Sequence, residues 1–100
     1  MRRILVFHLF LLIISNSVDS AVIRGKIRDR ETGVELIGSQ VYVKELKRGS
    51  VSGLDGSYII KNVPGGSYHI SCSYIGYQTV EMQITVDDAD AKIFDLNLEE

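Results

Sequence analysis

The sequence has a single cysteine, Cys72, among its 100 residues. An internal disulfide needs two cysteines, so the disulfide framework that stabilises many small exported domains is excluded. Cys72 is two residues from both Ile70 and Tyr74, so in a strand it shares one face with them. A reactive thiol needs exposure and nearby positive charge, so we expect Cys72 to be buried and unreactive. The stability of the domain must therefore come from packing.

A block of basic residues is also missing. Lys and Arg number 11 against 13 Asp and Glu, which gives a formal net charge of −2. This mixed, slightly acidic balance argues against nucleic acid or an anionic membrane surface as the partner. A long apolar run is missing as well, because the run over residues 4–14 is far shorter than the roughly 20 residues of a spanning helix.

The first residues nevertheless follow a known pattern. A positive segment at residues 1–3 precedes the apolar run at 4–14, and a small, polar stretch then leads to Ala21. This order is typical of a secretory signal with cleavage before Ala21. We therefore expect a cleavable signal peptide over residues 1–20 and one folded, exported domain over residues 21–100.

From residue 21 onward the apolar residues recur at every second position, which is typical of half-buried strands. Sustained three–four spacing is absent, so we expect essentially no helix in the domain. Short strands at this spacing predict an all-β sandwich or barrel, and two sheets would bury both inner faces. The expected inward sets are Ile23 and Ile27; Val41 and Val43; Tyr58 and Ile60; Tyr68, Ile70, Cys72 and Tyr74; Val80, Met82, Ile84 and Val86; Phe94, Leu96 and Leu98.

Turn signals separate these sets. Residues 29–33 predict a turn closed by glycine, with Asp29 bonding the backbone two residues on. The Asp-Gly pair in residues 54–57 predicts a tight hairpin. Residues 63–66 suit a type II turn with positive φ at the glycine after the proline. Gly76 predicts a bulge or a bend, and residues 87–90 the final turn.

Six segments also carry a resemblance to a known family: Gly25 to Asp29, Glu31 to Gly33, Leu36 to Val41, Gly53 to Ile60, Val63 to Tyr68 and Ser73 to Tyr77. In this order they resemble the carboxypeptidase regulatory-like domain over nearly all of residues 21–100. The resemblance implies a prealbumin-like, Ig-like β-sandwich of about seven strands. Ile37 departs from the pattern, since the family usually has proline there.

The Ser-Tyr-Ile-Gly-Tyr element over residues 73–77 resembles the N-terminal extension of TonB-dependent outer-membrane receptors of the starch-utilisation type. This implies a non-catalytic accessory domain of a nutrient-uptake receptor, in the periplasm or at the outer membrane of a Gram-negative bacterium. Such a domain works by contact with a protein partner and needs no cofactor. No linker, plug or barrel follows Glu100, so two interpretations stay open: a fragment of such a receptor, or a stand-alone secreted module that binds, for example, carbohydrate.

Chemistry-bearing residues are few. His69 is the only histidine after residue 20, and no nucleophile elbow or set of zinc ligands accompanies it. Three aspartates in residues 87–90 lack the spacing of a calcium loop, so a solvated turn is favoured. We therefore expect no catalytic, cofactor-binding or metal site.

Aromatic and charged side chains suggest contacts instead. Tyrosines at positions 42, 74 and 77 could form a platform for a sugar, and Tyr42 and Tyr77 are the expected contact residues. The basic cluster in residues 44–48 is interpreted as a soluble hairpin end. Outward charges at positions 24, 26 and 28 are interpreted as protection of an edge strand against aggregation.

Overall fold

The computed structural model describes residues 20–100, so the expected signal peptide lies outside the described residues apart from Ser20. The described part contains no helix long and apolar enough to cross a membrane. It forms eight strands, β1 (Ala21–Asp29), β2 (Gln40–Val43), β3 (Arg48–Val51), β4 (Ser57–Val63), β5 (Gly66–Ser73), β6 (Val80–Val86), β7 (Ala91–Ile93) and β8 (Leu96–Leu98).

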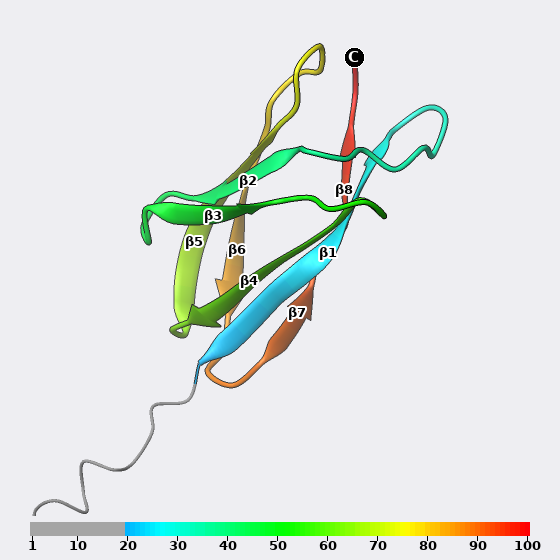
Figure 1. Ribbon diagram of the computed structural model, residues 1–100. Coiled ribbons are helices and arrows are strands. Elements are labelled where there is room, and N and C mark those ends of the chain that lie inside the picture. The colour runs from blue at the N-terminus through cyan, green and yellow to red at the C-terminus, as the bar shows by residue number, and fades with distance from the viewer. Residues whose placement is uncertain (1–19) are drawn as a thin grey trace, which may run out of the picture.

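The strands make a sandwich of two four-stranded sheets (Figure 1). In one sheet β1 is central, with β4 antiparallel on one side and β7 and β8 parallel on the other. The other sheet has the order β3-β2-β5-β6 and is antiparallel throughout. The predicted all-β sandwich is therefore confirmed.

The six apolar sets of the sequence become eight strands, one more than the expected seven, for two reasons. The last apolar set, expected as one strand, is divided at Phe94 and Asp95 into β7 and β8. β3 has the sequence Arg-Gly-Ser-Val, which shows no alternation and gave no strand signal.

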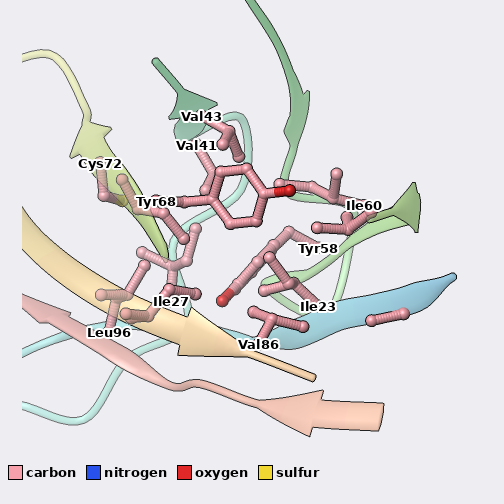
Figure 2. Close-up of a cluster of buried hydrophobic side chains, with 14 of the residues drawn as sticks. Ile23, Ile27, Val41, Val43, Tyr58, Ile60, Tyr68, Cys72, Val86 and Leu96 are labelled. Carbon is pink, nitrogen blue, oxygen red and sulfur yellow. The ribbon is translucent and has the colours of Figure 1, made fainter. Parts of the chain in front are cut away.

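The core lies between the sheets and contains side chains from both (Figure 2). Most of the expected inward residues are buried there, including Ile23, Ile27 and Ile70 at 1% exposure or less. Cys72 is also buried, as expected, and burial raises the pKa of its thiol to about 11. Four expected core residues are only partly buried against this cluster: Tyr74, Val80, Met82 and Phe94.

The charges on β1 do not protect an edge, and this interpretation was wrong. β1 has a paired strand on each side along most of its length. Arg24, Lys26 and Arg28 instead lie on the outer face of a central strand, where Lys26 Nζ lies 2.9 Å from Glu35 Oε2. Alternation of charged and apolar residues reports which face meets water, and it carries no information on the position of a strand within its sheet.

Two predicted turns connect different sheets. Residues 54–57 join β3 of one sheet to β4 of the other, so the expected tight hairpin is wrong although the chain does turn there.

Residues 63–66 likewise lead from β4 into β5 of the opposite sheet. Gly65 is not among the glycines with positive φ, so the type II assignment is wrong. Its N–H instead donates to Asp88 Oδ1 at 2.8 Å, which ties this turn to the turn at residues 87–90.

The other predicted turns form. Asp29 Oδ1 accepts the N–H groups of Glu31 and Thr32 at 2.8 and 2.9 Å, and Gly33 closes the turn with a φ of 78°. At Gly76, with a φ of 86°, the chain bends sharply between β5 and β6. Both bends use glycine because this region of φ is sterically costly for a residue with Cβ.

Arg48 has a larger role than the expected soluble hairpin end. It begins β3, and its guanidinium donates to the carbonyl oxygens of Lys61 at 2.8 Å and Asn62 at 2.5 Å. Those carbonyls belong to β4 in the opposite sheet. Arg48 therefore joins the two sheets across the edge where β3 and β4 lie.

Candidate contact surfaces

The outer face of the β3-β2-β5-β6 sheet contains a hollow of about 440 Å³ between β2, β5 and β6. We call it the Tyr42 groove, after the aromatic residue in it. Polar and aromatic residues that line it are Tyr42, Lys44, His69, Ser71, Glu81 and Gln83.

Strand register explains why these residues meet. Tyr42 on β2 lies opposite Ser71 on β5, and Ser71 lies opposite Glu81 on β6. His69 likewise lies opposite Gln83. Directly opposed residues point to the same face of a sheet, so these outward positions form one continuous surface across three strands. Tyr42 is 45% exposed there, which leaves much of its ring accessible.

Glu45 holds His69 at the rim of the groove. Its Oε1 accepts the backbone N–H of His69 at 2.8 Å, and its Oε2 lies 2.5 Å from the His69 Nδ1. The hydrogen bond from the His69 side chain, together with the one from its backbone, lowers the pKa of Glu45 to about 2. This pair orients the imidazole, and its two contacts fix the loop after β2 against β5.

Tyr77 lies in the loop between β5 and β6 and does not line the Tyr42 groove. Its hydroxyl donates to Asp29 Oδ2 at 2.6 Å. This hydrogen bond is the main reason that the pKa of Tyr77 is raised, to about 12. It is also the main reason that the pKa of Asp29 is lowered. Tyr77 therefore fastens the loop to the end of β1.

The three tyrosines expected as one platform occupy two places. The rings of Tyr74 and Tyr77 pack together with centroids 5.5 Å apart. Tyr74 lines a separate hollow with Gln40 and Ser73, while Tyr42 stands in its own groove. Of the two expected contact residues, Tyr42 has the exposed ring and the polar surroundings that a ligand would need.

Sequence reasoning did not single out Glu45, Glu81 or Gln83. Glu81 and Gln83 could have been found from the β5–β6 hairpin. Antiparallel pairing about Gly76 brings His69 and Ser71 beside the outward residues of β6. The aspartates of residues 87–90 are a different case. For them the sequence favoured a solvated turn over a calcium loop. Among residues 20–100 no group of three or more His, Cys, Asp or Glu could hold a metal ion.

Large apolar side chains are exposed in the loops. Ile75, at the loop between β5 and β6, and Leu54, in the turn before β4, are each 88% exposed. In Figure 1 the chain enters the sandwich at one end, and its C-terminus lies at the opposite end, near the β5–β6 loop. Ile75 therefore lies at the end of the domain where the described chain leaves it.

Comparison with known proteins identifies a family and a curated relative. The model of a family described as the CarboxypepD_reg-like domain matches residues 23–100. The TonB-dependent receptor P39 of Formosa agariphila is 34% identical over 97 residues, which cover 94% of this chain and 9% of that receptor. The chain thus spans less than a tenth of the relative that it matches.

Solved structures share the fold at low identity. The TIE protein of Bacillus anthracis superposes with a TM-score of 0.68 at 20% identity, over 85% of this chain and 17% of that one. A protein of Bacteroides uniformis, named as a candidate carbohydrate binding protein, gives 0.63 at 17% identity, over 80% and 41%. A similarly named protein of Pseudomonas aeruginosa gives 0.62 at 14% identity, over 82% and 90%.

Proposed function

The chain belongs to the CarboxypepD_reg-like domain family, and from this we propose that residues 21–100 form a non-catalytic interaction domain of a TonB-dependent nutrient-uptake receptor. The observation that carries the proposal is the 34% identity to a TonB-dependent receptor over 94% of this chain. The domain acts on the periplasmic side of the outer membrane. Residues 1–20 serve as the signal peptide that directs it there.

The mechanism is contact between proteins without bond chemistry. Ile75 and Leu54, each 88% exposed, are the side chains whose burial against a partner would contribute most to such a contact. Ile75 is the better placed of the two, because the β5–β6 loop that contains it lies at the same end of the sandwich as the C-terminus (Figure 1). In this proposal the rest of the receptor, or another envelope protein, packs on that end.

An antibody raised against residues 21–100 tests this proposal on fractionated source cells. We expect a band in the outer-membrane fraction, at a mass well above the 11.2 kDa of this sequence, because the relative is a far longer receptor. A periplasmic marker protein and an outer-membrane porin serve as fraction controls. A band found only in the cytoplasm would contradict the proposal, and a small soluble periplasmic band would favour a stand-alone module.

A second candidate function is carbohydrate binding, and the Tyr42 groove favours it. The apolar face of a pyranose stacks on an exposed tyrosine ring, and its hydroxyls find partners in carboxylate and amide groups such as Glu81 and Gln83. Two proteins of the same fold are named as candidate carbohydrate binding proteins, although at 17% and 14% identity they support the fold alone.

Tyr42→Ala separates this candidate from the first. If the groove binds a glycan, we expect a glycan array to detect it, and calorimetry to show a loss of at least tenfold in affinity in Tyr42→Ala. Tyr42→Phe keeps the ring and should keep most of the binding. Tyr77→Phe, outside the groove, is the matched control for Tyr42→Phe and should leave glycan binding unchanged. Glycan binding that survives Tyr42→Ala, or no binding to any glycan, counts against this function.

A further inference from the structure

β6 is an edge strand with an open side. It pairs with β5 over all seven of its residues in one unbroken register, from Val86 opposite Gly66 to Val80 opposite Cys72. On its other side it pairs with no strand of residues 20–100. The backbone N–H and C=O groups along such a side are a template for a further strand.

β6 lacks most of the features that usually protect an edge, and Glu81 is its one charged residue. Its sequence Val-Glu-Met-Gln-Ile-Thr-Val contains no lysine, proline or glycine, and its register with β5 has no bulge. The other open edges differ. β3 has four residues with an arginine and a glycine, β7 and β8 have three residues each, and β4 contains Lys61 and a positive φ at Asn62.

The inner face of β6 is also incompletely covered. Ile84 and Val86 are buried, whereas Val80 and Met82 on the same face are only partly buried. A strand added beside β6 would cover these two side chains with its own inward residues. The edge therefore presents both free backbone groups and apolar surface to a partner.

We propose that β6 pairs antiparallel with β6 of a second copy of this chain, around a twofold axis at Gln83. Opposed residues share a face, so a register that joins the two inner faces must place the axis on a residue and not between two residues. An axis at Gln83, the middle residue of β6, pairs all seven positions. The two sheets then become one continuous sheet.

The sequence of β6 is complementary to itself in this register. Val80 lies opposite Val86 of the second copy and Met82 opposite Ile84, so every inward pair is apolar. Glu81, the only charged residue of β6, lies opposite Thr85, and no like charges meet. The two Gln83 amides meet at the axis, where each can donate to the other. This self-complementarity identifies a second copy as the partner, and it holds whether or not the chain serves a receptor.

Cysteine cross-linking tests the register directly. The experiment uses the 100-residue chain, expressed with its own N-terminal residues and purified as the cell processes it. In Gln83→Cys the two new thiols are directly opposed, with Cα atoms about 4.5–5.5 Å apart, which suits a disulfide. We expect a covalent dimer under mild oxidation. Buried Cys72 does not compete.

Glu81→Cys is the matched control on the same face of the same strand. In the proposed register its two thiols are displaced by four residues along the strands, about 13 Å, and cannot bond. We expect little covalent dimer from this variant. Equal cross-linking of the two variants, or none in Gln83→Cys, overturns the proposed register.

Sedimentation velocity tests the association itself. We expect the wild-type chain to dimerise as its concentration rises, and Gln83→Glu to raise the dissociation constant about tenfold, because two carboxylates then meet at the axis beside both Glu81 side chains. Gln40→Glu makes the same charge change on β2, inside the sheet, and should leave association unchanged. A wild-type chain that stays monomeric overturns the proposal. So does a monomer that binds a different protein through β6, since the edge would then belong to that partner.

Discussion

Gly25→Ala should destabilise the sandwich by about 3–5 kcal/mol, through overpacking against the backbone and the loss of a hydrogen bond that the backbone makes. Gly25 lies in the central strand β1, where a Cβ would come within 2.1 Å of the carbonyl oxygen of Phe94. At such a distance the two atoms cannot coexist, so one backbone segment must move.

The Phe94 segment is held in place by three hydrogen bonds. Its carbonyl oxygen accepts from the Tyr58 hydroxyl at 2.5 Å, and its N–H donates to Arg24 O at 2.7 Å. The side chain of the next residue, Asp95, accepts the N–H of Lys26 at 2.9 Å. A methyl group at position 25 displaces this segment and so breaks the contacts that join β7 and β8 to β1.

Urea unfolding of the wild type and the variant measures this effect as a change in the free energy of unfolding. Gly53→Ala is the matched control, because a Cβ there meets only Ser57 O, at 3.9 Å. We expect its effect to stay within about 0.5 kcal/mol. Equal stability of the two variants would mean that the backbone of Phe94 does not lie against Gly25.

Local patterns in the sequence predicted the faces of the strands well. Period-two alternation placed Ile23, Ile60 and Ile70 in the core, because side chains alternate across a strand wherever that strand lies. The Asp29 turn was predictable for a similar reason: its hydrogen bonds join residues two and three apart. Each of these features depends only on neighbours in the chain.

Features that depend on distant partners were not predictable in this way. The order of strands puts β1 in the middle of its sheet, and no local pattern reports that order. The Asp-Gly pair at residues 55–56 predicts a reversal of the chain, but not whether the next strand pairs with the last one or crosses to the other sheet. Gly25 has no room for a Cβ because of Phe94, which lies 69 positions further along the sequence. The hydrogen bond from Lys26 to Asp95 spans the same separation.

The candidate site divides along the same line. Tyr42 could be selected from the sequence because it is an aromatic residue at an outward position, between the inward residues Val41 and Val43. Its neighbours Glu81 and Gln83 could not, because they reach the groove through two successive strand pairings. The sequence also could not show that Tyr77 is engaged by Asp29, 48 positions away, through a hydrogen bond.

Ile60→Ala should lower the free energy of unfolding by about 2–5 kcal/mol, as the truncation of a buried isoleucine usually does. Ile60 on β4 is 3% exposed, lies opposite Ile23 of β1 and belongs to the core (Figure 2). A domain of this size has about 4–12 kcal/mol of stability in total, so this one change removes a large part of it.

The adjacent residue provides the control, since Ile59→Ala is the same substitution on the opposite face of the same strand. Ile59 is 43% exposed and lies opposite Arg24, so we expect a loss of about 1 kcal/mol or less. Urea unfolding of the two variants compares burial alone, because strand, residue type and removed atoms are identical. Equal losses would show that β4 does not direct Ile60 into the core, and would contradict the assignment of inner and outer faces on which both the Tyr42 groove and the β6 edge depend.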